Sequence, residues 1–324
     1  MHLFVYYNST HSKEDGTWFY YTLITYFEFV CICISYPLVF YLGVLLFKYR
    51  LFHKNLQNCV KLCVIEYLVQ LTTRTMQIFL IFHGKENGNA FFWASYARCT
   101  CYFFVSFSLF IIAFERCCAS YFLSDYEKKN RHFIFVFILI VFPPSSAYLA
   151  WLYHIVESTI ILHVAMLAVN IFCSFTILQI EKYNYVRLEA SAKLRKSKKE
   201  YSLAERFQIS ENIRVCEFMK TIINVVSAFN LMSTISAALD NFDFSITFLN
   251  IATTFFNICV LTYGSLVFFL FYYLSPPFRM EIKRMLTWMR VTHPVNPIVD
   301  KEKPMQMAAQ ETDAYFDQLN KQWL

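Results

Sequence analysis

Three charged residues lie at a similar depth inside long apolar stretches of this sequence, where a charge is unfavourable unless a partner or the protein interior receives it. They are Glu28, Arg74 and Arg98. If each stretch forms a helix that rises 1.5 Å per residue, all three lie about 12 Å from the same end of their helices. Gln70 and Gln77 share a helical face with Arg74, so a polar stripe should point towards the other two charges.

This group of residues has two interpretations. In the first, Glu28 forms an ion pair with Arg74 or Arg98 that only holds the helices in place. In the second, two arginines against one glutamate leave a spare positive charge, which favours a small anionic or hydrogen-bond-accepting ligand between aromatic walls. On the second interpretation, the candidate ligand-binding residues are Glu28, Gln70, Arg74, Gln77 and Arg98.

The composition identifies lipid as the solvent of the apolar stretches. Of the 324 residues, 57% are hydrophobic and only 16% are charged, whereas soluble domains contain about 25% charged residues. A soluble chain of this size cannot hide 36 Phe residues, because its surface must be largely polar. The net charge of +6 is too small to indicate a nucleic-acid partner, and the expected partner is the lipid bilayer.

Seven stretches are long enough to span a bilayer, which takes about 20 residues in a helix. The second is the weakest, because it contains Lys61, Glu66 and Arg74. The sequence therefore predicts an all-α membrane protein whose residues 19–274 form a seven-transmembrane helix bundle. The expected spans are 19–47, 56–82, 90–114, 133–153, 158–180, 215–239 and 244–274.

The basic residues of the loops predict the orientation of this bundle. With the N-terminal segment 1–18 outside, the outer segments carry 2 Lys or Arg residues and the inner segments carry 23 of the 29 in the chain. Asn8 begins an Asn-Ser-Thr sequon on the predicted outer side, so it is a candidate glycosylation site. Cys117 and Cys118 fall at the inner membrane edge, where they are candidates for palmitoylation.

A charged pair ends the third span at the inner face. Glu115 and Arg116 occupy the place where rhodopsin-like receptors have their Asp-Arg switch. Arg116 could pair locally at rest and release when helices move, which would open a pocket for a partner. The alternative is that the two residues only mark the membrane boundary.

Two further segments of the inner face are predicted to be helical. The 181–214 loop has nine basic and five acidic residues, and a capping box at 202–205 (SLAE) predicts a helix that runs on into the sixth span. This helix is either a solvated charged surface or a docking surface for a signalling partner. After Pro276 and Pro277, a basic amphipathic helix should lie on the inner leaflet, and a disordered tail should follow it.

Three stretches of the inner face carry a family resemblance. They are 50–56 (RLFHKNL), 115–122 (ERCCASYF) followed by 125–129 (DYEKK), and 201–208 (YSLAERFQ). In this order and in these topological places, they resemble the nematode serpentine receptor class epsilon chemoreceptors, a family of seven-transmembrane G-protein-coupled receptors. The resemblance covers nearly the whole chain, from the first span to the tail.

This resemblance implies a chemosensory receptor of the plasma membrane, in sensory neurons, that binds a small-molecule chemical ligand and signals to a heterotrimeric G protein. It implies coupling roles for Glu115, Arg116, Asp125, Tyr126 and Arg206. The chain departs from rhodopsin-like receptors, because its seventh span ends in YLSPP and its sixth span has no Pro. The activation details of that class are therefore not transferred to this chain.

Other classes of function fit the sequence less well. The eight His residues do not cluster into a metal set and no Gly-x-Ser-x-Gly motif is present, so neither an enzyme nor a cofactor is expected. The seventh span has no Lys to carry retinal. A seven-helix ligand-gated channel or transporter is the alternative, although the sequence has no inverted repeat and no matched pair of broken helices.

Overall fold

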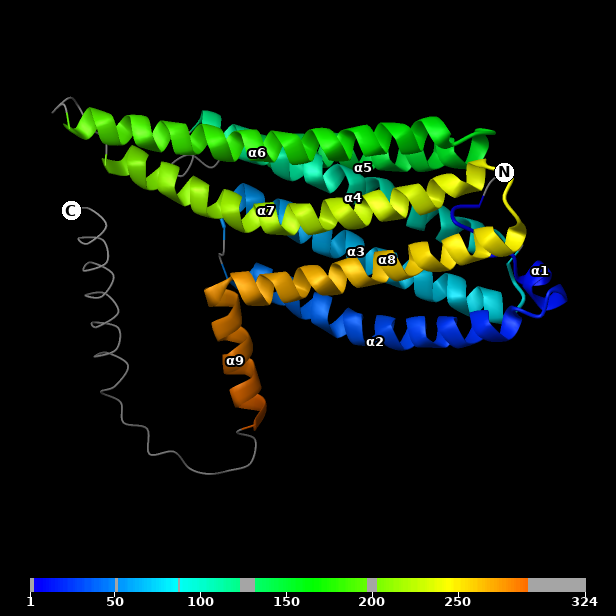
Figure 1. Ribbon diagram of the computed structural model, residues 1–324. Coiled ribbons are helices and arrows are strands. Elements are labelled where there is room, and N and C mark those ends of the chain that lie inside the picture. The colour runs from blue at the N-terminus through cyan, green and yellow to red at the C-terminus, as the bar shows by residue number, and fades with distance from the viewer. Residues whose placement is uncertain (1–2, 50–51, 87, 123–131, 197–202, 291–324) are drawn as a thin grey trace. The chain divides into compact units, whose positions relative to one another are not determined.

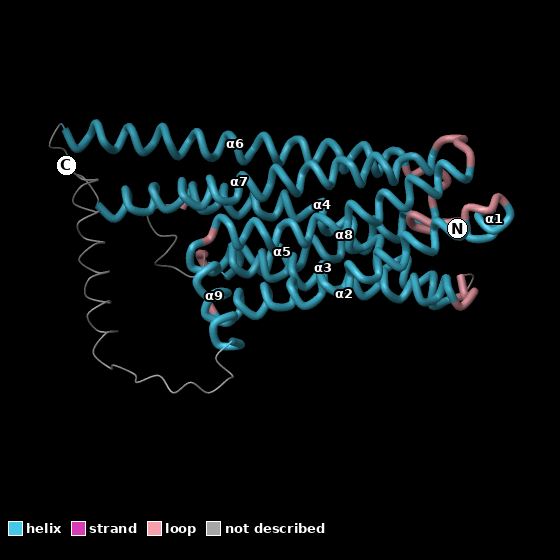
Figure 2. The backbone as a smooth tube through the Cα atoms, turned by 60° about the horizontal axis from the view of Figure 1, so that its bottom comes forward, coloured by secondary structure: helices cyan, strands magenta, loops and turns pink. Residues whose placement is uncertain are grey.

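The computed structural model describes residues 3–49, 52–86, 88–122, 132–196 and 203–290. The chain divides into two compact units, Met1–Phe278 and Arg279–Leu324. The first unit is a bundle of long helices that run alongside one another (Figure 1). Its described loops gather at the two ends of these helices (Figure 2).

The first unit contains seven long helices and two short ones. The short ones are α1 (Ser9–Glu14) and the 3-10 turn η1 (Leu239–Asn241). The described residues contain no strand, so the predicted all-α fold is confirmed. The long helices are α2 (Trp18–Lys48), α3 (Lys54–Phe82), α4 (Asn89–Tyr121), α5 (His132–Ile155), α6 (Ile160–Lys196), α7 (Leu203–Ala238) and α8 (Ile246–Leu274).

Six of the long helices are apolar and long enough to cross a membrane, and α3 is the exception. α3 has 29 residues, which is ample for a span, but its polar side chains lower its hydropathy. Glu66, Gln70, Arg74 and Gln77 are nevertheless all buried. Because α3 contacts α2, α4 and α5, protein covers its polar face, and the predicted seven-helix bundle is confirmed.

Large apolar side chains cover the outside of the bundle. Phe27, Ile140, Ile161 and Ile171 are all highly exposed, which is the arrangement expected where lipid replaces water. In contrast, α4 contacts α3, α5, α6 and α7 and most of its apolar segment is buried. The chain is therefore a multi-pass membrane protein with α4 at the centre of its bundle.

Besides α4, which runs to Tyr121 instead of residue 114, two helices continue past the span ends that the sequence predicts. The fifth span is expected to end at residue 180, whereas α6 runs to Lys196, because residues 181–196 are rich in strong helix formers and contain neither Gly nor Pro. α7 begins at Leu203 and runs unbroken into the sixth span, as the capping box predicts. Both helices extend beyond their neighbours at the end of the bundle opposite α1 (Figure 1).

The chain forms a further helix after α8. α9 (Pro276–Arg290) begins two residues after the end of α8, and its first two residues are prolines, which are favoured in the first turn of a helix. This is the helix that the amphipathic pattern predicts. Residues 291–324, for which the sequence predicts a disordered tail, lie outside the described residues.

Candidate functional site

Glu28 and Arg74 form a bidentate ion pair between α2 and α3. The Nε atom of Arg74 donates to Oε1 of Glu28 at 2.6 Å, and its terminal NH2 nitrogen donates to Oε2 at 2.7 Å. Both side chains are buried. Paired hydrogen bonds of this kind are the strongest form of arginine–carboxylate contact, so the partner of Glu28 is Arg74 rather than Arg98.

Arg98 of α4 is held by amides instead of a carboxylate. One terminal nitrogen donates to Oε1 of Gln77 at 2.9 Å, the other donates to Oδ1 of Asn257 on α8, and the guanidinium carbon lies 5.4 Å from the ring centre of Phe256. The side chain is 1% exposed, and its Nε atom is buried without a hydrogen-bond partner among the described residues. The structure therefore contains a buried cation whose described hydrogen-bond partners include no carboxylate, and the Glu28 carboxylate that acts on it from a distance is already paired with Arg74.

Gln70 also belongs to the buried polar face of α3. Its Oε1 atom is buried without a described hydrogen-bond partner. The structure thus brings together Glu28 with Arg74 and Gln77 with Arg98, while the described hydrogen bonds do not join the Gln70 side chain to either pair. Of the five predicted ligand-binding residues, Gln70 and Arg98 each have a side-chain atom without a described hydrogen-bond partner, and of these two only Arg98 carries a charge.

The N-terminal segment enters the bundle, and the sequence does not predict this insertion. The ring of Phe4 is 1% exposed and lies 5.1 Å from Tyr102, 5.3 Å from Tyr153 and 5.4 Å from Phe256, measured between ring centres. The Phe4 backbone N–H donates to Oγ of Ser95 at 2.9 Å. Phe4 therefore fills an aromatic cage formed by α4, α5 and α8.

Polar contacts hold residues 6–9 of this segment across the α1 end of the bundle. The Tyr6 hydroxyl and the Ser9 hydroxyl donate to the two carboxylate oxygens of Glu86, at 2.9 and 2.6 Å. Burial and the bond to Glu86 raise the pKa of the Tyr6 hydroxyl above its usual value. The backbone N–H of Asn8 donates to Oδ1 of Asn250 at 2.9 Å. We refer to residues 3–9 as the N-terminal lid.

Backbone strain accompanies the insertion of the lid. Val5 has a φ of 45°, which is unfavourable for a β-branched residue and persists only where the surrounding structure enforces it. Next to it, the ring of Tyr7 stacks on Tyr21 of α2 at a centroid separation of 3.4 Å. The lid is thus fixed on both sides of the strained residue.

A cavity of about 390 Å³ adjoins the lid at the α1 end of the bundle. Leu3, Tyr6 and Asn8 form one side of it. Two carboxylates, Glu157 and Asp240, lie on its wall. We refer to this space as the outer cavity; its remaining lining residues are Tyr153, Thr159, Asn241, Ile246, Leu249 and Asn250.

His163 is a second buried polar side chain near the aromatic cage. It is 1% exposed, and neither ring nitrogen has a hydrogen-bond partner among the described residues. Its ring lies 5.9 Å from Tyr153 and 6.4 Å from Tyr102. The sequence signal for this residue is that it is the single His within a predicted span.

At the opposite end of the bundle, Glu115 and Arg116 pair with each other. Nε and a terminal nitrogen of Arg116 donate to the two carboxylate oxygens of Glu115 at 2.6 and 2.8 Å, and the other terminal nitrogen donates to Oδ1 of Asn212 at 3.4 Å. Both residues are almost fully buried. The pair at the end of α4 is therefore joined to α7 through Asn212.

α6 is joined to both of these helices at the same end. Asn184 donates from Nδ2 to Oγ of Ser120 at 3.0 Å, which links α6 to α4. Lys220 of α7 lies 3.0 Å from a carboxylate oxygen of Glu181 on α6. These contacts close the end of the bundle from which α6 and α7 project.

The other predicted coupling and modification residues differ in what the structure describes. Asp125 and Tyr126 lie outside the described residues, and Arg206 lies in the first turn of α7 with an undescribed side chain. Cys117 is exposed and Cys118 is half-buried near the end of α4. Asn8 caps the N-terminus of α1 by accepting a hydrogen bond from the backbone N–H of His11.

Comparison with known proteins identifies the relatives of this chain. A family model described as Sre G protein-coupled chemoreceptor matches residues 59–324. Serpentine receptor class epsilon-8 of Caenorhabditis elegans is 26% identical over 97% of this chain and 95% of its own length. Serpentine receptor class epsilon-13 of the same organism is 27% identical over 88% of this chain and 80% of its own. The resemblance seen in the sequence is confirmed.

Proposed function

The chain belongs to the family of Sre G protein-coupled chemoreceptors, and we propose that it detects a small external chemical at the α1 end of its bundle and signals to a heterotrimeric G protein at the other. In this proposal the receptor lies in the plasma membrane of sensory neurons with its N-terminus outside. The 23 basic residues of the inner segments, against 2 in the outer segments, support this orientation.

The environment of Arg98 is the observation that carries the ligand proposal. A buried guanidinium without a carboxylate is unfavourable, since its desolvation is not offset by an opposite charge. The amides of Gln77 and Asn257 supply only partial charges. A ligand that brings a carboxylate or a strong hydrogen-bond acceptor to Arg98 would remove this deficit, so we expect small acids and carbonyl compounds.

The lid lies between the outer cavity and Arg98. Phe4 contacts Phe256, and Phe256 contacts the Arg98 guanidinium. A ligand that enters through the outer cavity must therefore displace the Phe4 ring before it reaches the cation. Because the cage of Phe4 is built from α4, α5 and α8, displacement would act on three helices at once, which is a route from binding to helix movement.

Coupling is assigned to the Glu115–Arg116 pair and its contact with Asn212. In the closed arrangement the Arg116 guanidinium is occupied by Glu115 and by α7. Movement of α7 away from α4 would lengthen the 3.4 Å contact to Asn212, because this contact joins the two helices whereas the bonds to Glu115 lie within α4. We expect the G protein to occupy the space that this movement opens.

Neutralisation of Arg98 tests the ligand proposal. Cells that express the receptor would be exposed to a panel of small carboxylic acids, esters and alcohols, with calcium or cyclic nucleotide as the signal. We expect Arg98→Gln to abolish the response to the active acids while surface expression persists. An unchanged dose–response curve in Arg98→Gln would contradict the proposal.

A matched variant separates this effect from loss of the neighbouring ion pair. Glu28→Gln combined with Arg74→Gln removes both charges of a pair that is already neutral overall, so we expect its response to survive wherever surface expression does. Arg116→Gln provides the signalling control, because it should abolish the response without changing ligand binding. A response that persists in Arg116→Gln cells would favour a channel over a coupled receptor.

A further inference from the structure

A second cavity lies inside the bundle, away from the lid and from Arg98. It has a volume of about 80 Å³ and is lined by residues of α2, α3, α4, α7 and α8. None of the lid residues and none of the predicted ligand-binding residues lines it. Most of its wall is aliphatic, including Leu42, Val60, Leu109, Ile112, Ile223 and Val267. We refer to it as the inner cavity.

Glu66 of α3 is the one acidic residue on the wall of this cavity. Both of its carboxylate oxygens are buried, and the one described donor that faces them is the weak thiol of Cys101 on α4. The other two buried glutamates, Glu28 and Glu115, each have a bidentate arginine. A buried carboxylate without such a partner is unfavourable. Glu66 can therefore bind a cation, and the described residues do not supply one.

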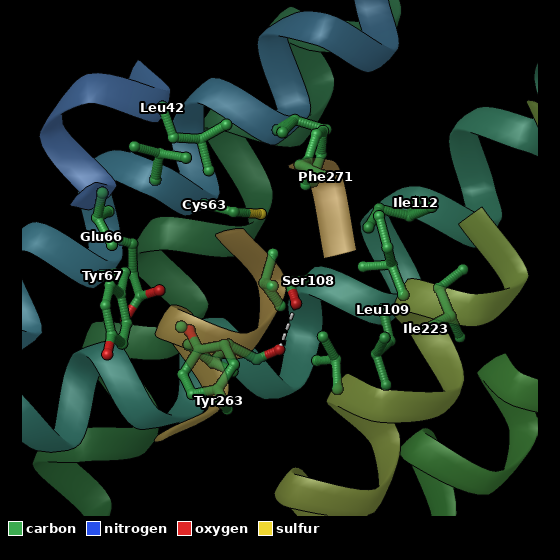
Figure 3. Close-up of a pocket in the computed structure, with 18 of the residues that line it drawn as sticks. Leu42, Cys63, Glu66, Tyr67, Ser108, Leu109, Ile112, Ile223, Tyr263 and Phe271 are labelled. Atoms are coloured by element: carbon green, nitrogen blue, oxygen red, sulfur yellow. Dashed lines mark hydrogen bonds between the residues drawn. The ribbon is translucent and has the colours of Figure 1, made fainter. Parts of the chain in front are cut away.

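Two tyrosines stand on the same wall as Glu66. The rings of Tyr67 and Tyr263 meet edge to face at a centroid separation of 5.1 Å, and both line the cavity. Figure 3 shows Glu66, Tyr67 and Cys63 on one side of the cavity, with Leu109 and Ile223 on the other. Aromatic faces attract ammonium groups through their quadrupole, so the polar side of the cavity is suited to an organic cation.

A bare metal ion is less suited to this wall. Hard cations take about six or more oxygen ligands, whereas the hydroxyls near Glu66 are engaged elsewhere. Ser108 donates to the backbone carbonyl of Val105 at 2.6 Å, and Tyr67 donates to the carbonyl of Leu261 at 2.8 Å. A molecule with one ammonium group and an aliphatic body would match both the carboxylate and the aliphatic wall.

From this arrangement we infer that the inner cavity is a second ligand site, which binds a small lipophilic amine with its ammonium group on Glu66 and its hydrocarbon chain against α4 and α7. One water molecule needs about 10–15 Å³ of such space, so the cavity has room for several water-sized groups, which suits a small amine rather than a bulky ligand. The site differs from the Arg98 site in place and in the sign of the charge that it receives. It does not depend on the identity of the external ligand.

Thermal unfolding of the purified full-length receptor in lipid nanodiscs tests this inference. The compounds used are hexylammonium chloride, hexanol as its neutral counterpart, and sodium chloride at matched ionic strength. We expect hexylammonium to raise Tm in a saturable manner, because a ligand that binds only the folded state stabilises it by mass action. Hexanol and sodium chloride should not reproduce this saturable increase.

Three variants locate the binding site. Glu66→Gln keeps the size of the side chain and should abolish the saturable increase in Tm. Ile223→Phe leaves Glu66 in place and narrows the cavity from α7. The hexylammonium concentration that gives a half-maximal increase in Tm should therefore rise at least tenfold. Asp240→Asn changes a carboxylate of the outer cavity and should leave the increase unchanged.

Several results would overturn the inference. An increase that survives Glu66→Gln and Ile223→Phe would exclude the inner cavity, and one that disappears in Asp240→Asn would place the amine in the outer cavity. An equal saturable increase with sodium chloride, lost in Glu66→Gln, would show a metal-ion site instead. If Glu66→Gln is too unstable to purify, the Ile223→Phe variant alone decides, because it retains the carboxylate.

Discussion

Replacement of Phe4 by Ala should open the N-terminal lid. The Phe4 ring is enclosed by Tyr102, Tyr153 and Phe256, and the backbone beside it is strained at Val5. The substitution removes the ring and its three aromatic contacts but leaves the polar contacts of residues 6–9 unchanged. It therefore tests whether the ring is what keeps the segment inside the bundle.

The size of the effect follows from the burial of the ring. Complete burial of a Phe side chain contributes about 1.5–3 kcal/mol, and aromatic pairs add about 0.5–1.5 kcal/mol beyond that. A loss of about 3 kcal/mol in lid closure corresponds to about a 100-fold increase in the population of the open lid, at 1.4 kcal/mol per tenfold change.

Cys99 provides a native reporter of lid opening. This thiol is fully buried in the same apolar cluster as Phe4, so a thiol reagent in the outer solution should reach it only when the lid is open. We expect Phe4→Ala to increase the rate of Cys99 modification about 100-fold, read by mass spectrometry of the peptide. Cys59, which is fully buried in a different cluster, is the internal control for general unfolding.

Phe19→Ala is the matched control variant, because Phe19 is 71% exposed on α2 and its loss should not affect the lid. Equal rates of Cys99 modification in the wild type and in Phe4→Ala would refute the reasoning, since the ring would then not limit access. A parallel increase at Cys59 would also refute it, because the substitution would have loosened the whole bundle.

Three further predictions concern the bundle and its orientation. Glu28→Gln and Arg74→Gln should each destabilise the purified receptor by about 3–5 kcal/mol, because each leaves a buried charge unpaired; thermal unfolding should show the double variant losing less than the sum, and additive losses would argue against the pair. Gly264→Ala should lower stability by about 1–3 kcal/mol, because a Cβ there would lie 2.1 Å from the ring of Tyr67; an unchanged Tm would contradict this packing. Endoglycosidase treatment should increase the gel mobility of the wild type but not of Asn8→Gln, and a wild type without this shift would argue against an external N-terminus.

The helices of the bundle could be predicted because each depends on local composition. Apolar stretches of about 20 residues must form helices in lipid, since every backbone polar group needs an internal partner. The extension of α6 to Lys196 could not be predicted in the same way. Residues 181–196 are rich in charge and have no apolar pattern. Hydropathy therefore cannot distinguish a helix that continues into solvent from a loop.

The partners of the buried charges were only partly predictable. The sequence placed Glu28, Arg74 and Arg98 at one depth, but helical spacing does not specify which faces of three different helices meet. The rotation and packing of α2, α3, α4 and α8 decide that Glu28 binds Arg74 and that Arg98 binds Gln77 and Asn257.

By itself, the sequence determined that this chain is a seven-helix membrane receptor of the class epsilon family, because hydropathy, charge asymmetry and three inner-face motifs are properties of contiguous residues. The tertiary structure alone decided that Phe4 closes an aromatic cage and that Glu66 faces a cavity without a described cationic partner for its carboxylate. Both features bring together residues that are far apart in the sequence. A local sequence pattern therefore cannot show which side chains this packing encloses or leaves unpaired.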